Sequence, residues 1–142
     1  MPAKELSLPI STQYDAIVAW RVWRISAENL LQSVFMADIW PAGQAIKACC
    51  ADSELRHGIH AFAATEQCEA RALAAAYMTE QSRGPKYVAF VLGEVSLWGR
   101  VVVHQAGYRA AYAYPRSLLV PSNAYDLASS LRRAYGVEVE MR

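Results

Sequence analysis

The chain has 142 residues, of which 54% are hydrophobic and 19% are charged, and its formal net charge is +1. This length and composition predict one folded domain with a full core and exclude an intrinsically disordered chain. The balanced charge produces no overall field toward nucleic acid or an anionic membrane, so a nucleic-acid partner is unsupported.

The apolar runs and the cysteine content indicate a cytoplasmic protein. VAFVLG and VVV are far shorter than the ~20 residues of a membrane span, and MPAKELSLPI lacks the apolar core of a signal peptide. Three cysteines, two of them adjacent, suit a reducing compartment and do not suggest a disulfide framework. We therefore expect a cytoplasmic location and no membrane partner.

The domain proper is expected over 15–142, after a flexible N-terminal arm at 1–14 that shows no clear period. The stretch AIVAWRVWRI at 16–25 is dense in β-branched and aromatic residues and predicts a strand. Alternation places Arg21 and Arg24 on opposite faces of this strand. Both faces are otherwise apolar, as in an interior strand.

Three short strands are predicted to follow a turn at 26–29. LLQSVF at 30–35 is expected to pair back on the first strand as a hairpin. Beyond a second turn at 40–43, QAIKACC at 44–50 and GIHAFAA at 58–64 have the composition of further short strands.

An amphipathic helix is predicted directly after these strands. Thr65 is expected to be its N-cap, and Glu66 and Glu69 in the first turn suit the positive end of the helix dipole. Apolar residues recur at helical spacing, Tyr77 among them, so one face of the helix is expected to be buried. A Gly-Pro pair ends it.

The second half of the chain predicts a long hairpin. A strand is expected over 87–104, with Gly93 and Gly99 marking a bulge or a sharp bend that splits it. QAG at 105–107 then turns the chain into GYRAAYAYPRSLLV. This pair of strands is the clearest hairpin in the sequence.

The C-terminal region predicts a second helix, capped by Asn123 and ended by Gly136, and VEVEM returns as an edge strand. Hairpins outnumber βαβ units, which indicates an α+β domain with a mostly antiparallel sheet and two main helices. A doubly wound nucleotide-binding fold is disfavoured, and neither GxGxxG nor GxxxxGK[ST] occurs.

Cysteines and histidines predict no metal site. Cys49 and Cys50 are adjacent and point to opposite faces of a strand, as would His57 and His60 if both lay in one strand. Cys68 near a helix N-terminus is a candidate nucleophile, but two neighbouring glutamates raise the pKa of its thiol. We expect Cys68 to be a buried core residue instead.

A polar and aromatic face of the sheet is the remaining candidate site. Glu94 stands among strong strand formers and must reach solvent, an arginine or a ligand, because burying a lone carboxylate is costly. An ion pair with a neighbouring arginine is the alternative. The face would be lined by His60, Glu94, Tyr108, Tyr112 and Tyr114, with Arg21, Arg24 or Arg109 at its margin.

The order HGIHAF, a helix ending near AAAYMTE, and the strand VAFVLGEVSLWG is similar to the core of a known superfamily. It resembles the diphtheria-toxin-like branch of the ADP-ribosyltransferases, which includes the poly-ADP-ribose polymerases, over residues 57–99. The resemblance implies a split antiparallel sheet that clasps NAD. The chain is also similar to small uncharacterised bacterial proteins with the same motif order.

The resemblance assigns nucleotide-binding roles to four residues. His60 takes the place of the family's tyrosine on the glycine-isoleucine strand, and Tyr77 that of the helix tyrosine that stacks on nicotinamide. The family's ribose-binding histidine falls within AWRVWRI, where Arg21 or Arg24 is present. An arginine there is more similar to the arginine, serine and glutamate branch of the superfamily.

The catalytic glutamate is where the chain departs from the family pattern. The stretch GYRAAYAYP, where that glutamate is expected, has no carboxylate. Glu94 stands in an earlier strand, and Glu138 or Glu140 would have to supply the group from the last strand. The resemblance therefore implies a domain that binds NAD or a related nucleotide and is a degenerate or divergent transferase.

A protein-interaction or regulatory module on the same scaffold is the alternative function, because aromatic residues are enriched where partners dock. Exposed tryptophans would favour such a module. Buried tryptophans, together with a cleft beside His60 and Tyr77, would favour the nucleotide. The four tryptophans are Trp20, Trp23, Trp40 and Trp98.

Overall fold

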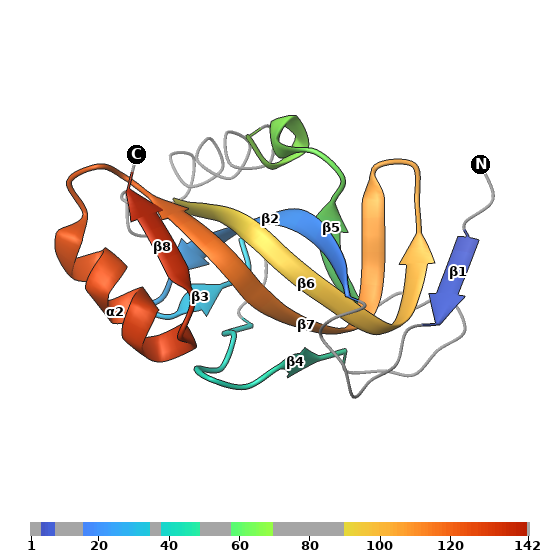
Figure 1. The fold of residues 1–142 in the computed structure, drawn as a ribbon, viewed down its shortest axis with the longest axis horizontal. Helices are drawn as coiled ribbons and strands as arrows, with labels where there is room; N and C mark the ends of the chain where they lie inside the picture. The colour runs from blue at the N-terminus through green and yellow to red at the C-terminus, as the bar shows by residue number, and fades with distance from the viewer. Residues whose placement is uncertain (1–3, 8–15, 35–37, 49–57, 70–89, 142) are drawn as a thin grey trace, which may run out of the picture.

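Two strands of 14 residues each, β6 (Phe90–Val103) and β7 (Gly107–Val120), form an antiparallel hairpin on which the fold is built (Figure 1). The computed structural model describes residues 4–7, 16–34, 38–48, 58–69 and 90–141. The remaining elements are β1 (Lys4–Ser7), β2 (Ile17–Ile25), β3 (Leu31–Gln32), β4 (Ile46–Lys47), β5 (Ile59–Phe62), α2 (Tyr125–Tyr135) and β8 (Glu138–Met141).

The described strands form one eight-stranded sheet. All neighbouring strands are antiparallel except β7 and β8, which are parallel. The prediction of an α+β domain with a mostly antiparallel sheet is therefore confirmed. The split sheet implied by the resemblance is not what the described strands form, because β6 and β7 are long enough to join the strands on both sides.

The pairing of four strands closes a ring. β2 lies along the first half of β6, β5 lies along the first half of β7, and β6 and β7 pair with each other. β2 and β5 then meet at one antiparallel pair, Trp20 and Phe62. The ring brings β5 next to β2, although the two strands are far apart in the sequence.

Glycines accommodate the bends in the long hairpin, as predicted, but the predicted split of the strand is wrong. The β6–β7 register shifts between Glu94 and Val95, and again between Trp98 and Val101. Gly99 lies at the second shift with a φ of 75°, and a Cβ atom there would lie 2.7 Å from the Tyr112 ring. These irregularities bend the hairpin without splitting β6.

Alternation along β2 separates two hydrophobic clusters. Trp23 belongs to the main core, whereas Val22 packs in a smaller cluster with Cys68 on the other face. Arg21 shares the face of Trp23, and Arg24 shares the face of Val22, which confirms the predicted division of the arginines. Cys68 is fully buried, as expected.

Helix α2 packs one side against the sheet at the end opposite the β6–β7 turn (Figure 1). Ala128, Leu131 and Tyr135 are buried, and Gly136 ends the helix with a φ of 65°, both as predicted. The predicted cap at Asn123 is wrong. Ala124 is the N-cap, because its N–H bonds to the Pro121 carbonyl in a turn that moves the helix start by one residue.

The first predicted helix is described only over residues 65–69. It starts at Thr65, so the predicted N-cap is displaced by one residue. The side-chain oxygen of Gln67 accepts the backbone N–H of Ala64 at 3.1 Å and so satisfies a group at the start of the helix. Tyr77 and the rest of this predicted helix lie outside the described residues.

Part of the predicted N-terminal arm is a strand. Lys4–Ser7 pair as β1 with Arg100–Val103 of β6. β2 pairs with the same strand only as far as Leu97, so the backbone groups beyond it are available to β1. The other residues of the arm lie outside the described residues.

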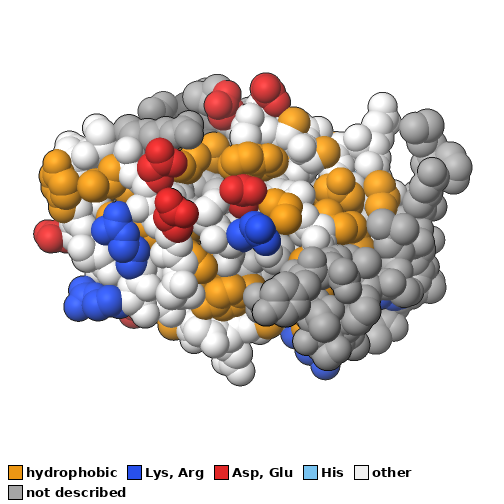
Figure 2. All heavy atoms as spheres, in the orientation of Figure 1, with side chains coloured by type: hydrophobic (Ala, Val, Ile, Leu, Met, Phe, Trp, Pro, Cys, Tyr) orange, Lys and Arg blue, Asp and Glu red, His pale blue; other side chains and the backbone are white. Residues whose placement is uncertain are grey.

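The described helices and surface bear on two further expectations. Neither described helix is long and apolar enough to cross a membrane. Lys and Arg side chains and Asp and Glu side chains both lie on the face shown in Figure 2, in agreement with the near-zero net charge.

Candidate functional site

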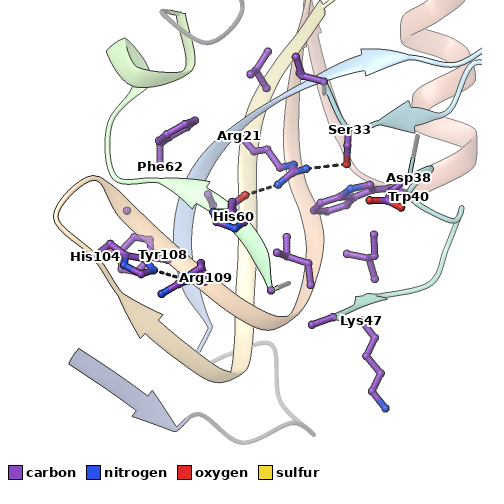
Figure 3. A pocket seen from close by; sticks show the side chains of 18 of the residues that line it. Arg21, Ser33, Asp38, Trp40, Lys47, His60, Phe62, His104, Tyr108 and Arg109 are labelled. Atoms are coloured by element: carbon purple, nitrogen blue, oxygen red, sulfur yellow. Dashed lines mark hydrogen bonds between the residues drawn. The ribbon is translucent and has the colours of Figure 1, made fainter. Parts of the chain in front are cut away.

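A cavity of about 950 Å³ lies between β2, β4, β5, the segment after β3 and the β6–β7 turn (Figure 3). This volume lies within the usual range of small-molecule pockets. Two of the predicted site residues, Arg21 and His60, line the cavity. Ring closure explains their proximity, because it places β5 beside β2.

Arg21 links three walls of the cavity. Its Nη1 donates to the backbone carbonyl of His60, and its Nη2 donates to Ser33 Oγ at 3.1 Å. The guanidinium carbon lies 4.9 Å from the centre of the Trp40 ring, within cation–π distance. Figure 3 shows the side chain reaching from β2 between His60 and Ser33. Arg21 therefore cross-links the walls of the cavity and contributes a positive charge to it.

Trp40 is held rigidly behind Arg21. Its ring packs edge-on against Trp23 with centroids 5.2 Å apart, and only 2% of the residue is exposed. The Trp40 carbonyl accepts the hydroxyl of Tyr135 at 2.7 Å, and the same hydroxyl accepts the N–H of Leu31 at 2.8 Å. Burial raises the pKa of Tyr135 to about 12, so this donor stays protonated at neutral pH.

His60 and Arg109 lie directly opposite each other in the β5–β7 ladder. Cross-strand partners of this kind point to the same face of the sheet, and both residues line the cavity. His60 is exposed. Its backbone carbonyl holds Arg21, so its ring and its main chain contribute separately to the site.

His104 and Arg109 form a pair across the β6–β7 turn. Arg109 Nε donates to His104 Nε2, and the turn is closed by a 2.7 Å bond from the His104 N–H to the Gly107 carbonyl. The pKa of His104 is lowered by burial and then by the Arg109 charge, so the imidazole is favoured in its neutral form. His104 was not among the residues predicted from the sequence, although a histidine and an arginine flanking a hairpin turn were the available signal.

The other predicted residues lie away from the cavity. Arg24 is on the opposite face of β2 from Arg21, and Glu138 and Glu140 are exposed on β8 on either side of buried Val139. Glu94 faces Trp20 on the smaller cluster's side of the sheet. None of these four residues lines the cavity.

The expected polar and aromatic face is divided among three surroundings. Ser117 Oγ donates to Glu94 at 3.0 Å, and Tyr112 stacks on Trp98 with ring centroids 6.1 Å apart. Tyr114 donates its hydroxyl to the carbonyl of Tyr135 at 2.6 Å. Of the predicted face and its margin, the cavity is lined by His60, Tyr108, Arg21 and Arg109, and not by Glu94, Tyr112, Tyr114 or Arg24.

Basic side chains outnumber acidic ones among the charged residues of the described cavity lining. Arg21, Lys47 and Arg109 contribute positive charge, and the carboxylate among the described lining residues is that of Asp38. No cluster of three His, Cys, Asp or Glu side chains suited to a metal occurs within the described ranges. The arrangement favours an anionic ligand held by guanidinium and imidazole groups.

Comparisons with models of protein families, with curated proteins and with solved structures find no match to this chain, and the resemblance to ADP-ribosyltransferases stays a prediction.

Proposed function

We propose that the cavity binds NAD or a related nucleotide. The observation that carries this proposal is a cavity of about 950 Å³ that is lined by both Arg21 and His60 and whose described charged residues are three basic ones and Asp38. The resemblance alone assigned these residues to the nucleotide, and Arg21 donates a hydrogen bond to the backbone carbonyl of His60.

The lining suits the chemistry of a nucleotide. Guanidinium groups match phosphate oxygens, and Phe62 and Tyr108 supply apolar surface beside them. Arg21 and Arg109 are contributed by different strands, β2 and β7. The cavity can therefore contact a ligand from two sides, as an extended dinucleotide requires.

The placement of the tryptophans supports a ligand cavity over a docking surface. Trp23, Trp40 and Trp98 are buried, and Trp20 is half-buried. The large hydrophobic residues exposed among the described ones are Val18, Ile39 and Tyr125. Val18 lies on β2 and Tyr125 on α2, and neither lines the cavity. These two exposed residues therefore do not form a continuous hydrophobic surface with the cavity.

Binding without group transfer is the form of the function that the geometry favours. ADP-ribose transfer needs a carboxylate at the ribose, and Glu94, Glu138 and Glu140 do not line the cavity. A degenerate member of the superfamily would retain the nucleotide site and lack the catalytic glutamate; the carboxylate among the described lining residues is that of Asp38, to which the resemblance assigns no role.

Calorimetric titration with NAD tests the proposal. Saturable binding near micromolar, about 8 kcal/mol, is expected. No heat and no change in melting temperature at millimolar NAD would refute it. Incubation with labelled NAD is expected to give little target modification. Strong labelling would contradict the non-catalytic form, and labelling that survives Glu138→Gln and Glu140→Gln would exclude these two residues as the catalytic group.

A further inference from the structure

We propose that Arg109 and His104 form an oxyanion subsite of the cavity that takes a phosphate or diphosphate group. The subsite rests on the proposed function, because it names the part of the nucleotide that the β6–β7 turn would hold. Its geometry comes from the cross-turn pair and not from the resemblance.

The turn presents Arg109 in a defined orientation. Its Nε is directed at His104 Nε2, which leaves the two Nη groups at the other edge of the guanidinium. Within the described ranges, Nη1 and Nη2 of Arg109 have no hydrogen-bond or ion-pair partner. A guanidinium edge of this kind matches two oxygens of a phosphate group.

His104 contributes a second function to the subsite. Because its Nε2 accepts the bond from Arg109, the neutral ring carries its proton on Nδ1, on the side of the ring that faces away from Arg109. The imidazole thus fixes the plane of the guanidinium. His104 is in this sense a positioning residue for Arg109.

The charge distribution in the cavity favours an anion at this end. Figure 3 shows His104, Tyr108 and Arg109 together on the hairpin, with Asp38 near Trp40 on the other side. Asp38 is the carboxylate among the described lining residues, so no described acidic side chain of the cavity is paired with Arg109. A bound phosphate would supply the missing negative charge.

Calorimetric titrations with ADP, adenosine and pyrophosphate test the subsite. Arg109→Gln is expected to lower the affinity for ADP and pyrophosphate at least about tenfold and to leave adenosine binding unchanged. Arg116→Gln is the matched control, because Arg116 is an exposed arginine of the same strand outside the cavity lining. It removes the same charge and is expected to leave all three affinities unchanged.

Two further variants keep the test decisive. Arg109→Lys retains the positive charge but lacks the planar guanidinium, and it is expected to lose part of the ADP affinity. This variant also tests the subsite if Arg109→Gln fails to fold. His104→Ala is expected to weaken ADP binding less than Arg109→Gln does, again without effect on adenosine. A fall in adenosine affinity as large as that for ADP would indicate a general structural effect and overturn the subsite.

The outcomes separate the subsite from the proposed function. If ADP binds Arg109→Gln or Arg109→Lys as tightly as the natural chain, the subsite is wrong and nucleotide binding stands. If Arg109→Gln weakens pyrophosphate binding, but NAD, ADP and adenosine bind the natural chain no more tightly than pyrophosphate does, the subsite is supported. The proposed nucleotide binding is then wrong. Absence of binding by all of these ligands refutes both.

Discussion

The hydroxyl of Tyr135 donates a 2.7 Å hydrogen bond to the carbonyl of Trp40 and thereby ties helix α2 to the wall of the cavity. Trp40 in turn stacks beneath the guanidinium of Arg21, which holds the His60 carbonyl. The C-terminal helix and the cavity are therefore connected through side chains that are largely buried.

Removal of this hydroxyl is expected to destabilise the fold. Tyr135→Phe leaves the Leu31 N–H and the Trp40 carbonyl without their side-chain partner in a buried place. We expect the free energy of unfolding to fall by about 1–3 kcal/mol. Urea denaturation measures this change. Tyr125→Phe, at a tyrosine of the same helix that is 67% exposed, is the control, and an equal effect of both variants would contradict the role of Tyr135.

The His104–Arg109 pair is expected to make stability depend on pH. The folded protein lowers the pKa of His104, so below the unfolded value of about 6.5 the unfolded chain binds more protons at this position. The contribution to stability is present above pH 6.5 and is lost as the pH falls through the lower folded value. We would measure the melting temperatures of the natural chain and of His104→Gln from neutral to mildly acidic pH. The difference between the two pH profiles gives the contribution of His104 to stability. A pH dependence identical in both would exclude it.

Substitution of Gly99 at the hairpin bend is expected to lower the free energy of unfolding. Gly99→Ala places a Cβ atom 2.7 Å from the Tyr112 ring at a φ of 75°. Gly43→Ala is the matched control, since Gly43 has a φ of 65° but nothing within 4 Å of the added atom. Strain alone costs about 1 kcal/mol, and the clash adds about 1–3 kcal/mol at Gly99. Chemical denaturation of both variants measures the difference, and equal losses would show that the ring moves aside at no cost.

The ring of His60 is expected to contribute to nucleotide binding separately from its main chain. His60→Ala keeps the carbonyl that Arg21 contacts, so circular dichroism should report an intact fold. We expect a loss of about tenfold in NAD affinity, or about 1.4 kcal/mol. From the resemblance, we expect a similar loss of NAD affinity in Tyr77→Ala. Arg24→Gln, on the other face of β2, should bind NAD normally, and undiminished affinity in both His60→Ala and Tyr77→Ala would remove the proposed site.

Local features of the fold could be predicted from the sequence because they depend on neighbouring residues. The apolar run at 16–25 predicted β2, and the glycines of β6 predicted its irregular register. Gly136 marked the end of α2 because glycine adopts the left-handed conformation without strain. The two caps were each displaced by one residue, since backbone turns and the Gln67 side chain decided where the helices start.

The assembly of the site was decided by tertiary structure alone. The bonds from Arg21 join residues 12 and 39 positions apart, and the Tyr135–Trp40 bond spans 95. Composition and alternation identified a basic residue on each face of β2. They carry no information on which of these faces borders the cavity beside β5. Ring closure through Trp20 and Phe62 chose Arg21 and left Arg24 outside the cavity, because strand partners depend on the path of the whole chain and not on local periodicity.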